Sequence, residues 1–361
     1  MERRYFIKTD RIGIDNYLTM VALENGLQAR LDGNDCEYCI DGNGVWKTLP
    51  ASELTEPINA RHTLSFRANL KPTSEIGVGT FAVNRLFNLK GNCMSLLYGD
   101  NVKENLSLPN SAFKSLFAGN DKLVSAKDLN LPTTNISAWG CYENMFKNCT
   151  ALQIAPKLPA TKVGIYGYRS MFNGCVSLTT VPELCAIELS NYSCVSMFQG
   201  CSFLESAPPL IATKLGANCY ERMFSSCTSL IDAPKLHATE LMGGCYNYMF
   251  SGCTSLTKAP ELPAIALAAN CYQGMFNKCT GLTTAPDLPA KTLINWCYSG
   301  MFSDCTSLNY IKMLATDISA TGCLSNWTSG VVSSGTFFKA IGVNIANGMS
   351  GIPSGWTVIE E

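Results

Sequence analysis

The dipeptide Met-Phe recurs every 26 residues in the second half of the chain, and this period constrains the fold more than any other feature. Seven copies follow one another without insertion or deletion, at Met145, Met171, Met197, Met223, Met249, Met275 and Met301. A fixed period of this length indicates one structural unit stacked on itself. We therefore predict a solenoid, an architecture whose extended surfaces usually bind other molecules.

The aligned copies define a unit that reads Cys-Tyr-x-x-Met-Phe-x-x-Cys-Thr-Ser-Leu-x-x-Ala-Pro-x-Leu-Pro-Ala-x-x-Leu and is almost intact over 245–267. In 270–279 the apolar residues fall three, four and eight positions apart, which predicts a short helix with one buried stripe. The stretch 281–286 alternates like a short strand that Pro286 ends, because proline cannot donate to a sheet. The predicted class is therefore α/β.

Stacked units would bury a column of leucines, one from each of the last six copies: Leu178, Leu204, Leu230, Leu256, Leu282 and Leu308. The residue that follows each leucine differs from copy to copy, which indicates exposure on the sheet face. We take five of these positions as candidate ligand-binding residues: Glu205, Ile231, Thr257, Thr283 and Asn309.

The Met-Phe-x-x-Cys-Thr-Ser-Leu and Ala-Pro-x-Leu-Pro-Ala units resemble the BspA-like leucine-rich repeats of surface proteins from gut anaerobes and of some of their phages. The resemblance covers about half of the chain and is specific, because several identities recur seven times. It implies an α/β leucine-rich-repeat solenoid used for adhesion or protein binding, with no defined ligand. The segment 37–46 also resembles a module that often precedes such repeats.

Four regions are expected along the chain. Residues 1–75 contain short alternating runs at 17–23, 27–31, 36–40 and 62–69, separated by turn residues, and predict a small β-sandwich-like module of immunoglobulin size. Residues 76–140 carry degenerate repeats and would cap the stack. The seven repeats occupy 141–322, and residues 323–361, rich in Gly, Ser and Val, would form the carboxyl-terminal cap.

Most of the 18 cysteines obey the repeat, in one column from Cys149 to Cys305 and another from Cys219 to Cys323. A free cysteine packs as a small buried hydrophobe, so we interpret the columns as thiols between layers, with bridges between layers as the alternative. Reduced thiols favour synthesis in the cytosol or an anaerobic habitat. The start, Met1-Glu-Arg-Arg-Tyr-Phe-Ile-Lys8, lacks the apolar run of a secretory signal, so we expect either no standard export or a signal removed beforehand.

Composition argues against several partners and cofactors. The formal charge is −1 and no basic stripe is present, which argues against nucleic acid. No apolar run reaches the roughly 18 residues of a membrane helix, so no membrane insertion is expected. The pair Cys36 and Cys39 has metal or redox spacing, but no second ligand pair accompanies it. The Gly-x-Gly-x-x-Ala motif at 77–82 follows no buried strand, so turn glycines explain it better than a dinucleotide site.

Catalysis also lacks a clear signal. The chain has two histidines, His62 and His237, and neither has a plausible catalytic partner nearby in the sequence. Acidic residues are scattered about one per repeat instead of paired, although pairing in space stays open. We therefore expect no enzyme, cofactor or metal, and instead recognition of a protein or glycan on a cell surface or matrix. The alternatives are a phage virion or tail-associated receptor-binding or structural protein and, second, a carbohydrate-active enzyme.

Overall fold

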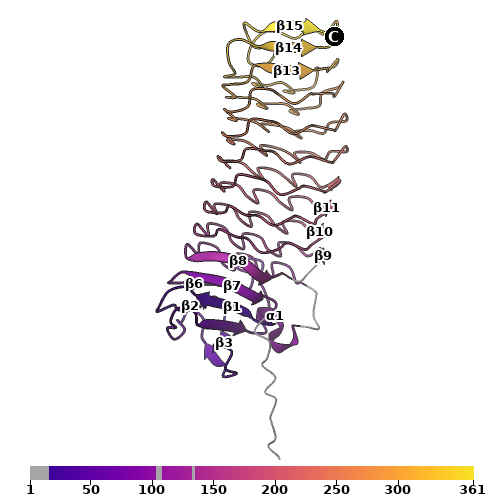
Figure 1. Cartoon of the computed structure of the whole chain (residues 1–361). Coiled ribbons are helices and arrows are strands. Elements are labelled where there is room, and N and C mark those ends of the chain that lie inside the picture. The colour runs from indigo at the N-terminus through magenta and orange to yellow at the C-terminus, as the bar shows by residue number, and fades with distance from the viewer. Residues whose placement is uncertain (1–15, 103–107, 132–134) are drawn as a thin grey trace, which may run out of the picture.

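The computed structural model describes residues 16–102, 108–131 and 135–361, and β structure dominates them (Figure 1). Helix in these residues is confined to a four-residue α-helix, α1 (Ser95–Tyr98), and the following 3-10 helix, η2 (Gly99–Asn101). The predicted α/β class is therefore wrong in its helical part. The amino-terminal segment 1–15, on which the expectation about an export signal rests, lies outside the described residues.

The amino-terminal part contains a six-stranded sheet in the order β4-β3-β5-β1-β7-β8. The strands of this sheet are β1 (Leu18–Ala22), β3 (Cys36–Ile40), β4 (Lys47–Leu49), β5 (Thr63–Arg67), β7 (Phe87–Asn92) and β8 (Leu123–Asn130). A separate antiparallel pair joins β2 (Ala29–Asp32) to β6 (Thr80–Val83). The four alternating runs identified in the sequence overlap β1, β2, β3 and β5, which confirms those strands.

The large sheet changes from antiparallel to parallel pairing at its last strand. Strand β1 pairs antiparallel with β5 and β7, whereas β7 and β8 run parallel. Ser125 in β8 then forms a parallel bridge with Ile154 in the repeats. The strands β6 and β7 lie beyond residue 75, yet they pair with β2 and β1. The repeats therefore continue the hydrogen bonding of the amino-terminal sheet beyond β8. This covers the edge of β8, which would otherwise be open.

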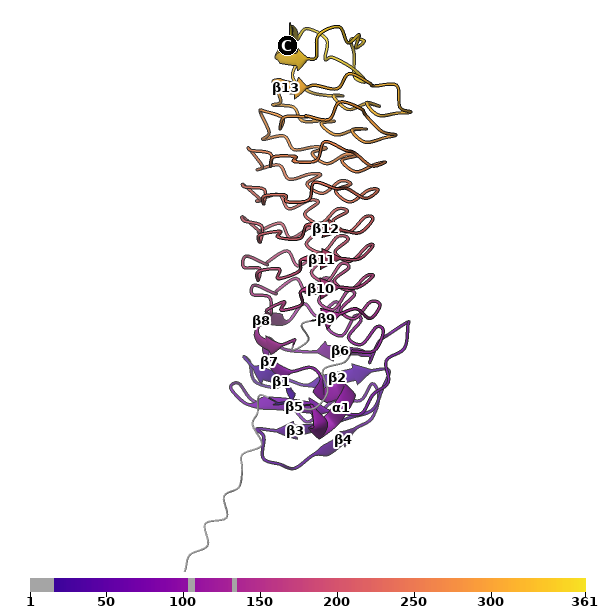
Figure 2. The ribbon, with the colours of Figure 1, turned by 90° about the vertical axis from the view of Figure 1, so that its right-hand side faces the viewer.

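Above β8 the chain is stacked in successive turns (Figures 1 and 2). Residues 26 apart bridge in parallel, as in Ile154 with Thr180 and Leu158 with Leu184. A further ladder is a four-stranded parallel sheet of β9 (Asn135–Ile136), β10 (Lys162–Val163), β11 (Glu188–Leu189) and β12 (Lys214–Leu215). The carboxyl end is a parallel sheet of β13 (Tyr310–Met313), β14 (Thr336–Lys339) and β15 (Thr357–Glu360).

The segment predicted as a helix in each repeat is a run of tight turns. Every fourth residue has positive φ, for example Asn144 at 57° and Asn148 at 60°. Local and interlayer hydrogen bonds alternate: the Met145 N–H donates to the Tyr142 carbonyl at 3.2 Å, and the Phe146 N–H donates to the Met171 carbonyl of the next layer at 2.9 Å. In an α-helix, the interior backbone N–H groups donate to carbonyls of the same helix. The turns leave every second amide for the adjacent layer, which ties the layers together.

Aromatic rings form the centre of the stack. Consecutive phenylalanines from Phe117 to Phe302 lie face to face, with ring centroids 5.5–5.9 Å apart and interplanar angles of 3–7°. Trp327 lies at the upper end of this column, 6.0 Å from Phe302. The leucine column predicted to be internal is fully buried, as Leu230 illustrates with 0% exposure.

The cysteines are buried free thiols, as the sequence predicted. All 18 are free, and all except Cys185 are at least largely buried. The column from Cys149 to Cys305 also has a bonding role that sequence reasoning missed. The Cys227 thiol donates to the Phe198 carbonyl at 3.1 Å, and that carbonyl also accepts from the Cys201 N–H at 3.1 Å. A small donor thus bridges adjacent layers where a methyl group could not.

Candidate functional site

The five residues predicted to bind ligand are all exposed and lie in one column. Their backbones pair between layers: Ile231 N–H donates to the Glu205 carbonyl at 3.1 Å, and Asn309 N–H to the Thr283 carbonyl at 2.9 Å. Beside Ile231, residues including Asp232 and Lys258 line a shallow hollow of about 320 Å³. The predicted exposure is confirmed, whereas a binding role for these residues stays a prediction.

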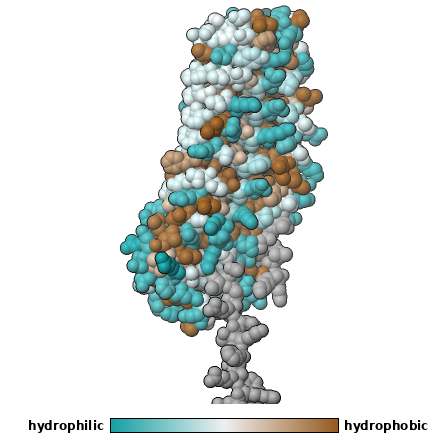
Figure 3. All heavy atoms as spheres, viewed as in Figure 1, coloured by the Kyte–Doolittle hydropathy of each residue, from teal (hydrophilic) through white to brown (hydrophobic). Residues whose placement is uncertain are grey.

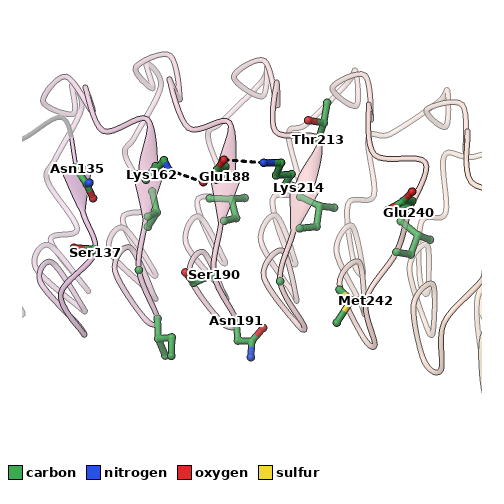
Figure 4. A pocket seen from close by; sticks show the side chains of 17 residues that line it. Asn135, Ser137, Lys162, Glu188, Ser190, Asn191, Thr213, Lys214, Glu240 and Met242 are labelled. Atoms are coloured by element: carbon green, nitrogen blue, oxygen red, sulfur yellow. Dashed lines mark hydrogen bonds and ion pairs between the residues drawn. The ribbon is translucent and has the colours of Figure 1, made fainter.

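A larger hollow of about 980 Å³ lies over β9 to β12 (Figure 4). Charged side chains of β10, β11 and β12 lie along it: Lys162 and Lys214 both contact Glu188, each with a nitrogen–oxygen distance of 3.0 Å. The hydrogen bonds from Lys162 and Lys214 lower the pKa of Glu188. Both lysine side chains are well exposed to solvent and Glu188 is partly exposed, so the pairs contribute little to stability. They do fix the charge pattern that a ligand would meet.

Small residues form the floor of this larger hollow because the layers approach closely there. A Cβ on Gly216 would lie 2.4 Å from the Asn191 nitrogen, and one on Gly164 would lie 2.6 Å from the Ser137 carbonyl oxygen. Ile165 and Met242 are 42% and 52% exposed among the residues that line it. The hollow thus follows from backbone packing, and both polar and apolar side chains line it.

A second hollow of about 350 Å³, which we call the arginine hollow, is the next feature along the same layers. It adjoins the larger hollow in sequence, because Ile165 precedes Tyr166 and Asn191 precedes Tyr192. The residues that line the arginine hollow are Tyr166, Arg169, Ser170, Tyr192, Val195, Ser196, Glu221 and Arg222.

Aromatic contacts hold the walls of the arginine hollow. The Tyr166 ring lies 5.4 Å from the Tyr192 ring and 5.5 Å from Trp139, measured between centroids. The Arg169 guanidinium lies over Tyr166 at 4.9 Å, and Arg222 lies over Tyr248 at 5.4 Å. Such cation–π contacts restrict each guanidinium to one surface of its ring.

Two carboxylates accompany these arginines at longer range. Arg169 Nη1 lies 3.5 Å from Glu143 Oε1, and Arg222 Nε lies 3.9 Å from Glu221 Oε1. The Glu143 carboxylate is almost fully buried and also contacts Lys114 at 3.4 Å. Burial raises the pKa of Glu221, with Arg222 and Arg169 opposing the shift. The arginine hollow therefore carries two cations and one half-desolvated acid.

Sequence reasoning missed the arginine hollow, although the alignment of repeats contains its signal. The residue two positions before each Met-Phe is Glu143, Arg169, Val195, Glu221 and so on. These residues lie in successive layers. Val195 is shorter than Arg169 and Glu221 in the layers on either side, so it leaves a gap between two charged side chains.

The structure also shows the surroundings of the glycine motif at 77–82, of Cys36 and of His62. Gly77 and Gly79 have φ of 61° and 104°, which confirms turn glycines. Burial raises the pKa of Cys36 to about 12, and the charges of Asp35 and Glu37 add to the increase. A thiol with so high a pKa does not form a reactive thiolate readily. The fold also gives His62 a partner that the sequence did not suggest, because its Nδ1 lies 2.5 Å from Asp41 Oδ2.

Within 16–102, 108–131 and 135–361, no group of three or more His, Cys, Asp or Glu residues is arranged to hold a metal ion. In the same ranges no helix has the length and apolar character needed to span a bilayer.

Comparison of the chain with protein-family models, with curated proteins and with solved structures gave no match in any of the three.

Proposed function

We propose that this chain is a non-enzymatic recognition protein whose stacked turns form a leucine-rich-repeat solenoid of the BspA-like type. Two observations support this proposal. Residues 26 apart, the period of the sequence repeat, form parallel β-bridges, and the repeated Phe, Leu, Met and Cys residues are buried. The positions that vary between copies, such as Glu205 and Thr257, are exposed. A constant interior with a variable exterior is the pattern expected of a binding scaffold.

The observation that carries this proposal is the pair of adjoining hollows over the layers of β9 to β12. They combine exposed aromatic and aliphatic side chains with hydroxyl, amide and charged groups, which is the composition of recognition surfaces. Three charged groups of the larger hollow, Lys162, Glu188 and Lys214, pair with one another, an arrangement that fits binding better than acid–base chemistry. The proposed partner is a protein or glycan on a cell surface or matrix.

The face shown in Figure 3 suits a polar partner, because hydrophobic and hydrophilic residues are mixed there along the length of the stack. The column that contains Glu205 and Ile231 offers a further contact face in this proposal. Interfaces of this mixed composition are common in non-obligate complexes.

Two settings are proposed for this recognition. In the first, the protein is an adhesin at a cell surface. In the second, it is a phage virion or tail-associated protein that contacts the bacterial envelope. The specific observation that favours the second is the set of 18 free and mostly buried thiols, because such a protein folds in a reducing cytosol.

The test is binding of the labelled full chain to intact bacterial cells, with immobilised host matrix proteins in parallel in one buffer. Saturable binding to cells alone supports the receptor-binding setting, and saturable binding to matrix alone supports the adhesin. An absence of saturable binding to either contradicts the recognition function.

A further inference from the structure

We propose that the arginine hollow binds a carboxylate-bearing saccharide. This inference rests on the proposed recognition function and assigns a ligand class to one part of its surface. The hollow has a volume of about 350 Å³, near the lower end of the range for small-molecule sites. A site of this size suits one sugar unit, either free or as part of a longer glycan that continues over the larger hollow.

The two arginines supply the recognition of a carboxylate. The side chains of Arg169 and Arg222 are 44% and 50% exposed, and both line the hollow. Their contacts to Glu143 and Glu221 are long for charge-assisted hydrogen bonds, which are usually about 2.7–2.9 Å. The planar guanidinium matches a carboxylate with two parallel N–H donors. Contacts with Tyr166 and Tyr248 limit the freedom that each arginine would lose on binding.

The tyrosines supply the recognition of the sugar ring. Tyr166 and Tyr192 lie in adjacent layers and both line the hollow, and Tyr192 is 36% exposed. A pyranose ring has a face of C–H groups and an edge of hydroxyls. An amphipathic tyrosine suits such a ligand, because its ring covers the apolar face and its hydroxyl meets the polar edge.

The remaining polar groups distinguish a carboxylated sugar from a phosphate. Glu221 accepts hydrogen bonds when ionised, and Ser170 and Ser196 can donate and accept. A sugar offers several hydroxyl donors to these acceptors, whereas a free phosphate dianion offers few and is repelled by Glu221. Two arginines and one glutamate leave one net positive charge, which complements a single carboxylate.

Val195 creates the space in which the ligand would lie. It occupies the layer between Arg169 and Glu221, where neighbouring layers carry long charged side chains. In a later layer the same position holds Gln273. Val195→Gln therefore places in the hollow a side chain that the stack accepts elsewhere, so it should obstruct the site without unfolding the chain.

The experiment uses ligand-observed NMR titration of the full chain with matched saccharides. Glucuronate and N-acetylneuraminate are the carboxylated probes, and glucose and the methyl ester of N-acetylneuraminate are their respective neutral counterparts. Inorganic phosphate and a short glutamate-containing peptide are added in separate titrations. The variants are Val195→Gln and Arg222→Gln, with Arg85→Gln as a control that removes an exposed arginine from the amino-terminal part.

The expected result is binding of at least one carboxylated sugar, with its neutral counterpart weaker by about tenfold or more. Val195→Gln and Arg222→Gln should each weaken this binding by about tenfold or more, because they remove the space and a charged donor respectively. Arg85→Gln should bind as the original chain does. Thermal unfolding of each variant shows whether a loss of binding accompanies a loss of structure.

Other results overturn the inference. Equal binding of glucuronate and glucose would refute carboxylate recognition, and tighter binding of phosphate or of the peptide would refute the assigned ligand class. Absence of saccharide binding by a chain that still binds cells or matrix would refute this inference and leave the recognition function standing. Absence of all binding would contradict both.

Discussion

The substitution Phe224→Ala should destabilise the stack strongly, because Phe224 sits in the middle of the aromatic column. Its side chain is 0% exposed, and its ring lies 5.7 Å from Phe198 and 5.8 Å from Phe250. The substitution removes the ring from both contacts at once. It also leaves a cavity between two layers whose backbones are fixed by hydrogen bonds on either side.

The size of the effect follows from these contacts. Truncation of a buried phenylalanine costs about 3–5 kcal/mol of unfolding free energy. Each stacked ring pair contributes about 0.5–1.5 kcal/mol beyond burial, so the loss of two pairs places Phe224→Ala at the upper end, about 4–5 kcal/mol. The control is Thr257→Ala, an exposed position for which a change within about 0.5 kcal/mol is expected.

The assay is urea unfolding of the full chain, followed by far-ultraviolet circular dichroism and by tryptophan fluorescence. Two probes are needed because long stacks can unfold in more than one step. A loss of less than about 1 kcal/mol for Phe224→Ala, or a similar loss for Thr257→Ala, would refute the assignment of inside and outside.

Three further predictions concern thiols, protonation and backbone packing. Alkylation of the native chain at pH 8, mapped by mass spectrometry, should modify the exposed Cys185 first. The other thiols are buried, and burial raises the pKa of Cys227, for example, to about 12. Glu221→Gln should raise the melting temperature at pH 7 and lose this advantage below about pH 4, because burial raises the folded-state pKa of Glu221 above its unfolded value of about 4.3. The folded state then binds more protons than the unfolded chain between the two pKa values, so stability falls as pH rises through that window. Gly216→Ala should lower the melting temperature, because a Cβ would lie 2.4 Å from the Asn191 nitrogen.

Each of these predictions has a result that would contradict it. Equally fast labelling of Cys227 and Cys185 would show that the layers open readily. A Glu221→Gln advantage that persists at pH 3 would mean that the gain comes from packing and not from protonation. An unchanged melting temperature for Gly216→Ala, with Gly243→Ala as a comparison where the nearest atom to a Cβ would be the Ala269 carbonyl oxygen at 3.5 Å, would contradict the close approach beside β12.

The sequence predicted the interior of the stack better than its local conformation. Burial of Leu230, of the Met-Phe pairs and of the cysteine columns follows from the period alone. The helix in each repeat was wrong because apolar residues three and four positions apart suit serial four-residue turns as well as a helix. The positive φ that distinguishes the two falls on residues such as Asn144 and Ser170, which do not identify a turn as clearly as glycine does.

The candidate site was harder to predict because it is assembled from three consecutive layers. Arg169, Val195 and Glu221 are unremarkable individually, and they form a hollow only where they align across the stack. The exposed column that includes Glu205 could be identified within one repeat, because it follows a buried leucine. The arginine hollow is visible in the sequence only where the variable columns of neighbouring repeats are aligned with one another.

The most direct test of the proposed recognition function is equilibrium binding of the labelled full chain to intact bacterial cells and to immobilised host matrix proteins. Saturable binding to one of these surfaces is expected, competed by excess unlabelled chain and retained by the exposed-site control Arg85→Gln. Binding that does not saturate on either surface, or that unlabelled chain does not compete, would contradict the recognition function.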